Sequence, residues 1–259
     1  LRYQIAQYAG FDNYVDFAYD FYYYRDYTPE QERALLEQVR QELVPVYRQM
    51  AQSDVWDLWG KESAEEENLK FAQGVVNEMG GVLREAFRTM EKNELYNISY
   101  GENKYPASFE TYLSYYGVPF VFMNPQGTIH DKLTLIHEFG HFANDYACGG
   151  SYAGVDVMEV FSQGMELLSL CYVEDDHGLT KVKLADSLCV YVEQAAYASF
   201  ERQVYNLSGE QLTVENIQAL YQTVGTSYGF DSWAWDSRDY VCTSHFFTSP
   251  MYVVSYVVS

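Results

Sequence analysis

The chain has 259 residues, of which 48% are hydrophobic and 20% charged, a composition typical of a globular protein with a buried core. The net charge of −21 argues against nucleic-acid binding, which needs clustered lysine and arginine, and no apolar run approaches membrane-spanning length. Four scattered cysteines without a CxxC pair exclude a cysteine-rich zinc site.

The first 95 residues are expected to be helical. Thr28 and Pro29 form a typical helix start, with an N-cap hydroxyl and proline at the first helical position. This helix is expected to run to about Arg48, with a bend at Pro45, which lacks a backbone donor. Further helices are expected over residues 4–9, 13–24 and, from an acidic start at 65–67, on either side of a weak point at Gly80 and Gly81.

Residues 96–124 are expected to form a small β-sheet. The segments ASFETYLSYY and VPFVFMN are short, aromatic and β-branched, and Gly117 between them suits a hairpin. From residue 125 to 259 the pattern is helical again, with loops expected at 147–154, 174–178, 206–213 and 227–232. His177 falls in one of these loops and is expected to be exposed, whereas His130 lies just ahead of the next helix.

The segment LTLIHEFGHFAND, residues 133–145, contains the motif HExxH. His137 and His141 are four positions apart and therefore project from one helix face, at a separation that suits two ligands of one tetrahedral ion. Glu138 lies about 100° around the helix, so it can act on a metal-activated water without binding the metal. The motif predicts a zinc site with Glu138 as general base.

The third zinc ligand is expected on the following helix. A metzincin would need glycine at 144 and histidine at 147, but the chain has Asn144 and Ala147. A second helix can supply a glutamate instead. Downstream, VDVMEVFSQGMELLSLCYV carries one polar stripe on an apolar helix, made of Asp156, Glu159, Ser162, Gln163 and Glu166. Carboxylates on a buried face need partners, so Glu159 is the predicted ligand, and Glu166 is predicted to orient a histidine.

The segments HEFGH and EVFSQGME together resemble the M3 family of zinc metallopeptidases, the group of thimet oligopeptidase and oligoendopeptidase F. In that pattern HExGH is followed by a glutamate ligand that begins an E-x-x-S segment, the place taken here by Glu159 and Ser162. The similarity extends over PFVFMNPQGTIHDKLTLIHEFGH and over the tail SHFFTSPMYVVSYVV. It covers most of residues 96–256, and more weakly the N-terminal helices.

The resemblance implies a mainly α fold with a small β-sheet, a zincin-type (gluzincin) catalytic domain that binds one Zn²⁺ per chain. It also implies that a histidine and a tyrosine of the tail reach the cleft and stabilise the oxyanion. His245 and Tyr252 are the candidates, with Tyr256 and Ser162 as further substrate-binding or supporting residues. Members of the family are considerably longer, and both ends of this chain interrupt helical or apolar patterns. Residues 1–259 are therefore expected to be a portion of one catalytic domain.

The expected function is that of a zinc metalloendopeptidase of the EC 3.4.24 type, which hydrolyses short peptides. An extended substrate is expected to pair with the edge strand near residues 107–116. Two alternatives stay open, namely a non-catalytic peptide-binding or structural remnant of this fold and a zinc hydrolase with another substrate. A cytoplasmic location is expected, with export left open because the chain starts at Leu1 without a methionine. The sequence does not indicate an oligomeric state.

Overall fold

The computed structural model describes residues 1–150, 154–173, 177–230 and 235–259. Its contacts divide the chain into two units, each described by itself. The helical unit comprises Leu1–Gln52, Gly154–Asp156 and Ser187–Ser259, and the sheet unit comprises Ser53–Ala153 and Val157–Asp186. Parts of the loops expected at 147–154, 174–178 and 227–232, namely residues 151–153, 174–176 and 231–232, lie outside the described residues.

The helical unit contains α1 (Arg2–Tyr8), α2 (Tyr14–Phe17), α3 (Pro29–Gln38), α4 (Val44–Met50), α11 (Val214–Ser227), α12 (His245–Thr248) and α13 (Ser255–Val258), together with α10 (His177–Tyr205) from Ser187 onward. Thr28 and Gln31 form a capping box at the start of α3, with Pro29 in the first turn as expected. A π-helical turn, Val39–Leu43, lies between α3 and α4, just ahead of Pro45. The helix expected to run to about Arg48 is therefore interrupted by this turn, close to Pro45.

The sheet unit contains α5 (Val55–Trp59), α6 (Glu65–Met79), α7 (Gly81–Lys92), β1 (Tyr96–Asn97), β2 (Ser108–Leu113), β3 (Val118–Met123), α8 (His130–Cys148) and α9 (Val155–Ser169) from Val157 onward, and it ends with α10 as far as Asp186. His177, expected in a loop, is instead the first residue of α10. The helix thus begins earlier than the sequence indicated.

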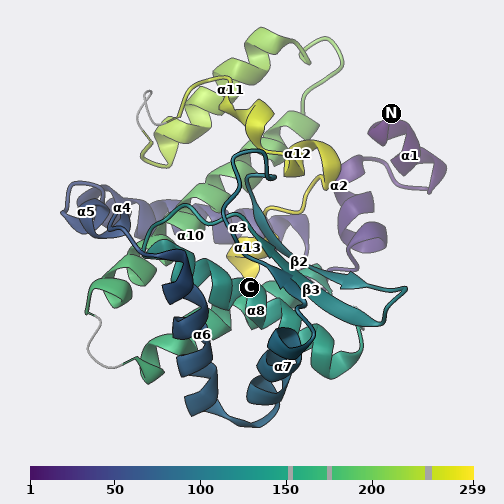
Figure 1. Cartoon of the computed structure of the whole chain (residues 1–259). Coiled ribbons are helices and arrows are strands. Elements are labelled where there is room, and N and C mark those ends of the chain that lie inside the picture. The colour runs from purple at the N-terminus through teal and green to yellow at the C-terminus, as the bar shows by residue number, and fades with distance from the viewer. Residues whose placement is uncertain (151–153, 174–176, 231–234) are drawn as a thin grey trace. The chain divides into compact units, whose positions relative to one another are not determined.

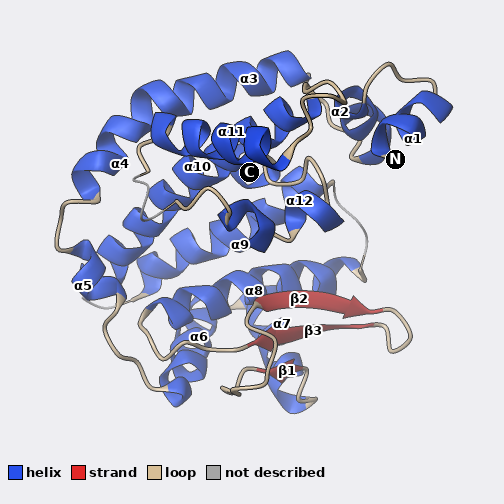
Figure 2. Cartoon of the chain, turned by 90° about the horizontal axis from the view of Figure 1, so that it is seen from above, coloured by secondary structure: helices blue, strands red, loops and turns tan. Residues whose placement is uncertain are grey.

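The three strands form one sheet in the order β1-β3-β2 (Figure 2). Strands β2 and β3 make the predicted antiparallel hairpin, in which Glu110 is opposite Val121, and Gly117 in the connection has a φ of +68° that suits glycine. Strand β1 pairs in parallel with β3 and was not predicted. It has only two residues, too few for a periodic pattern.

Helix α8 is buried on nearly all sides within the sheet unit. Leu135, Ile136, Phe139 and Phe142 of α8 are fully buried in one core, which also contains Val121 of β3. Helices α6 and α7 complete this core, and both pack against α8 (Figure 1). The helix that carries the HExxH motif is therefore held rigidly by its surroundings.

The mainly helical fold with a small sheet confirms the fold class expected from the sequence. No helix in the described part of the chain is long and apolar enough to cross a membrane.

Candidate metal centre

Helix α8 places the two motif histidines side by side. The rings of His137 and His141 lie edge to face with centroids 5.1 Å apart, one turn from each other on the same helix face. Their side chains are 24% and 12% exposed, so they border the surface of an otherwise buried helix. Two imidazoles are thus available to a ligand from one direction.

Helix α9 comes close enough to α8 to contribute a carboxylate. At Gly140 the backbones nearly touch, because a Cβ atom there would lie 2.7 Å from both the Phe161 carbonyl oxygen and the Ser162 Cα. This approach brings Glu159, which is 4% exposed, toward the two histidines. Position 140 of HEFGH is therefore occupied by glycine because a larger side chain would not fit between the two helices.

The imidazoles converge on one oxygen of Glu159. His137 Nε2 lies 3.5 Å and His141 Nε2 3.6 Å from Glu159 Oε2. Two ligand atoms bound about 2.05 Å from a tetrahedral zinc ion are about 3.3–3.4 Å apart. The donor set and its spacing therefore fit Zn²⁺, with His137, His141 and Glu159 as the residues that would hold it.

Glu138 is also close to the histidines, since the ligand atoms of His137, Glu138 and His141 all lie within 4.8 Å of one another. This looser grouping would allow Glu138 as the third ligand. We favour Glu159, which is nearer to both histidines and comes from a different helix. Glu138 instead accepts a hydrogen bond from the backbone N–H of Glu110 on β2, which points its carboxylate toward the sheet.

The charges of this cluster are strongly coupled. Burial alone would raise the pKa of Glu159, but a hydrogen bond from His141 and the charges of both histidines lower it to about 2. Burial would lower the pKa of His137, whereas the hydrogen bond and charge of Glu166 raise it to about 9. The carboxylates therefore favour the protonated form of His137, so a metal ion at its Nε2 would compete with a proton.

The pKa of Glu138 is raised, mainly by burial and in part by the charge of Glu159, while the histidines act in the opposite direction. A carboxylate with a raised pKa is a better proton acceptor near neutral pH. Glu110, which sequence reasoning did not single out, lies nearby with its own pKa raised to about 8 by burial and by Asp145 and Glu138. Glu110 could not be identified from the sequence, because its proximity to Glu138 depends on the packing of β2 against α8.

The other polar residues of the predicted stripe support the cluster. Ser162 donates its hydroxyl to Glu159 Oε2 at 2.9 Å, and Glu166 Oε1 lies 2.8 Å from His137 Nδ1. Since the Nδ1 nitrogen faces Glu166, the Nε2 nitrogen of His137 is directed at Glu159. This is the orientation expected of a histidine ligand whose tautomer is fixed by a carboxylate.

The three predicted residues of the tail belong to the helical unit and form a cluster of their own. His245 and Tyr252 stack with centroids 5.3 Å apart, and Tyr256 lies edge-on to both rings, at 6.1 Å from His245 and 5.4 Å from Tyr252. The structure thus brings His137, Glu138, His141, Glu159, Ser162 and Glu166 together in one unit, and His245, Tyr252 and Tyr256 together in the other.

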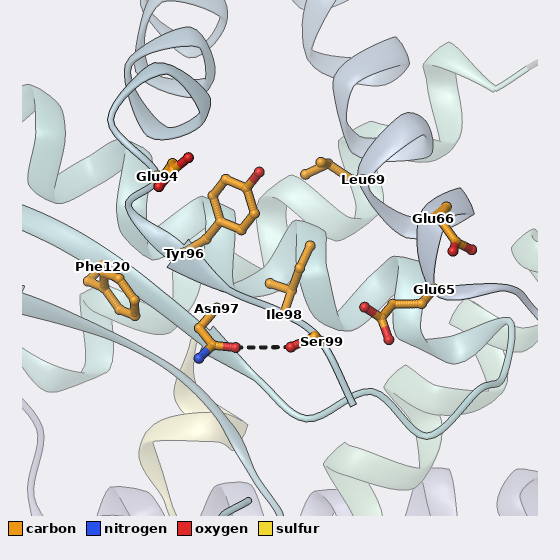
Figure 3. Close-up of a pocket in the computed structure, with 9 residues that line it drawn as sticks. All are labelled: Glu65, Glu66, Leu69, Glu94, Tyr96, Asn97, Ile98, Ser99 and Phe120. Carbon is orange, nitrogen blue, oxygen red and sulfur yellow. Dashed lines mark hydrogen bonds between the residues drawn. The ribbon is translucent and has the colours of Figure 1, made fainter. Parts of the chain in front are cut away.

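The sheet unit also has a pocket of about 490 Å³ that contains none of these residues (Figure 3). It is lined by Glu65, Glu66, Leu69, Glu94, Tyr96, Asn97, Ile98, Ser99 and Phe120. Glu66 and Glu94 are exposed, and Glu65 accepts the backbone N–H of Tyr100 at 3.0 Å. Solvated glutamates need no bound cation, so the candidate centre stays at His137, His141 and Glu159.

The fold is similar to that of solved peptidase structures. The chain is similar to PZ peptidase A with inhibitor 2, with a TM-score of 0.85 and 22% identity over 98% of this chain and 51% of that one. It is also similar to a structure described as an oligoendopeptidase F from Bacillus anthracis str. Ames, with a TM-score of 0.79 and 21% identity over 99% of this chain and 49% of that one. These likenesses agree with the resemblance inferred from the motifs.

No family model matches the chain, and no curated protein sequence matches it. The chain spans about half the length of the solved structures that it resembles. At these identities the likeness establishes the fold, and the chemistry has to be argued from the residues of the site.

Proposed function

We propose that this chain is the zinc-binding portion of a metalloendopeptidase that hydrolyses short peptides. The observation that carries the proposal is the convergence of His137 Nε2 and His141 Nε2 on Glu159 Oε2, with Glu138 next to the first histidine. Two histidines and a glutamate leave a fourth position for water or substrate, as in catalytic rather than structural zinc sites.

Zinc, when bound, polarises the scissile carbonyl and lowers the pKa of the attacking water. The proton of that water passes to the Glu138 carboxylate, whose pKa is raised by burial, and from there to the leaving amine. The N–H of Glu110 holds the carboxylate in place during both transfers. On the strength of the sequence resemblance, His245 and Tyr252 are proposed as donors to the oxyanion.

Strand β2 is proposed to bind the substrate backbone. It is the outer strand of the sheet and pairs only with β3 among the described residues, so its second edge can accept an extended peptide beside Glu110, whose N–H is bound to Glu138. Recognition through backbone hydrogen bonds favours broad sequence specificity. Short peptides are therefore the proposed substrates, and neither nucleic acid nor membrane is a proposed partner.

A second candidate function is a non-catalytic peptide-binding or structural module. The observation that favours it is the coverage of only about half of the similar peptidase structures. The presence of Glu138 speaks against it, because binding alone does not need a base beside the metal ligands.

Metal-dependent cleavage separates the two functions. We expect an internally quenched short peptide to be cleaved by the chain, cleavage to stop after chelation, and activity to return when zinc is added back. A zinc-loaded chain that binds the peptide but never cleaves it would favour the non-catalytic module.

A further inference from the structure

A line of charged side chains extends from the candidate metal centre into the sheet unit. His137 Nδ1 lies 2.8 Å from Glu166 Oε1, and the second oxygen of Glu166 accepts a hydrogen bond from Lys183 Nζ at 2.6 Å. Lys183 also donates to Asp186 Oδ2 at 3.1 Å, and Asp186 Oδ1 lies 3.2 Å from His130 Nε2. Glu166 and Asp186 each use their two oxygens for two different neighbours, and the single Nζ of Lys183 lies between the two carboxylates.

Lys183 is the unusual member of this line, because lysine is rarely buried. Its side chain is 3% exposed, and its helix neighbours Val182 and Ala185 are 0% and 4% exposed. Moving an ammonium group out of water costs several kcal/mol, and a buried ion pair recovers this cost only with good geometry. An apolar residue would be enough to fill this space. A buried lysine is therefore explained by its two carboxylate partners, Glu166 and Asp186, which need a positive charge beside them.

The far end of the line is fixed as well. His130 stacks on Trp59 with ring centroids 4.4 Å apart, and its Nδ1 lies 3.3 Å from the Thr134 hydroxyl. Asp186, held by His130, gives Lys183 a second carboxylate three residues along α10. The ammonium is therefore tied on both sides and cannot leave Glu166 by a simple change of rotamer.

We propose that Lys183 is a positioning residue of the metal centre, which clamps Glu166 so that His137 presents Nε2 to the ion. This inference rests on the proposed zinc site and adds to it a residue outside the HExxH and E-x-x-S segments. Glu166 has two oxygens, and Lys183 occupies one of them, which leaves the other for His137. Without Lys183, the side chains of Glu166 and His137 would sample other rotamers. Metal binding would then have to order both side chains, and this loss of conformational entropy would lower the metal affinity.

The test is a double-mutant cycle on zinc affinity, measured by competition with a chelator of known affinity. Lys183→Met is expected to weaken zinc binding by about 10- to 100-fold, the loss typical of residues that support a metal ligand. Glu166→Ala is expected to weaken it by a similar factor. The double variant should bind no more weakly than Glu166→Ala, because Lys183 acts only through Glu166.

Lys181→Met is the matched control, since Lys181 lies two residues away on the same helix and is exposed. It should keep wild-type affinity. If Lys183→Met does not fold without metal, the cycle is run with Lys183→Gln, whose uncharged amide can still donate hydrogen bonds and which should give a smaller loss in the same direction.

Unchanged zinc affinity in a folded Lys183 variant would overturn the inference while leaving the proposed zinc site intact. Losses that multiply in the double variant would also overturn it, since they would mean a general structural role. A wild-type chain that binds no zinc would remove both the site and the clamp.

Discussion

The proposed metal centre depends on the carboxylate of Glu159. The pKa of Glu159 is lowered to about 2, so its carboxylate is ionised at neutral pH. The Nε2 atoms of His137 and His141 both face this carboxylate. Glu159→Ala is expected to reduce zinc affinity by more than the 10- to 100-fold typical of a supporting residue. Isothermal titration with zinc measures this loss, and Glu67→Ala, at an exposed position on α6, is the control. Equal affinities in the two variants would contradict the assignment.

Glu201 predicts a pH dependence of stability in the helical unit. Burial raises its pKa to about 8, although the backbone N–H of Met251 donates to its carboxylate at 2.8 Å. Between pH 4.5 and 8 the unfolded chain has lost this proton while the folded chain keeps it, so the contribution of Glu201 to stability falls as pH rises.

Glu201→Gln should remove this dependence, with a difference in slope of up to about 1.4 kcal/mol per pH unit between wild type and variant. Urea unfolding at a series of pH values measures the slopes. Glu210→Gln, at an exposed loop position, should follow the wild type. If the free energy of unfolding changed with pH in the same way in the wild type and in Glu201→Gln, Glu201 would not have a raised pKa in the folded chain.

The sequence predicted the site residues to different extents. His137, Glu138 and His141 follow from the spacing of one helix, and Glu159 from a polar stripe on an otherwise apolar one. Glu110 and Lys183 could not be predicted, because their contacts join β2 to α8 and α10 to α9. Local patterns carry no information about such pairs, and a single lysine in an amphipathic helix is usually taken to face water.

At the scale of elements, the crossing of α8 and α9 determines whether Glu159 can reach the histidines. Gly140→Ala would place a methyl group 2.7 Å from backbone atoms of α9, so the helices must separate. We expect a loss of about 1–3 kcal/mol of unfolding free energy and weaker zinc binding.

Gly164→Ala on α9 is the matched comparison, since no atom lies within 4 Å of the new methyl group. This change should stabilise the chain by about 0.5–1 kcal/mol through helix propensity. Chemical denaturation of both variants measures the contrast. If Gly140→Ala were as stable as Gly164→Ala, the close crossing would not be a feature of the protein.

The periodic pattern of hydrophobic residues predicted most helices and the β2–β3 hairpin, since these elements are long or are bounded by proline and glycine. Strand β1 and the exact start of α10 were missed. Strand β1 forms through its pairing with β3, a contact distant in sequence that overrides weak local preferences.

At the scale of the whole molecule, metal binding should be linked to folding. Zinc at about 100 times its dissociation constant is expected to add roughly 2.7 kcal/mol to the stability of the unit that binds it. Thermal unfolding with and without zinc should therefore show a higher midpoint for wild type with zinc and no shift for Glu159→Ala. A zinc-induced shift that persists in Glu159→Ala would place the metal elsewhere.

Peptide hydrolysis by the wild type and by Glu138→Ala is the first measurement to make, because it tests whether the chain is a zinc-dependent peptidase with Glu138 as base. Zinc content is determined on both samples. We predict about one zinc per chain in each and cleavage of a quenched short peptide by the wild type alone. Equal cleavage by both proteins would contradict the role of Glu138, and the absence of zinc from both would contradict the metal centre itself.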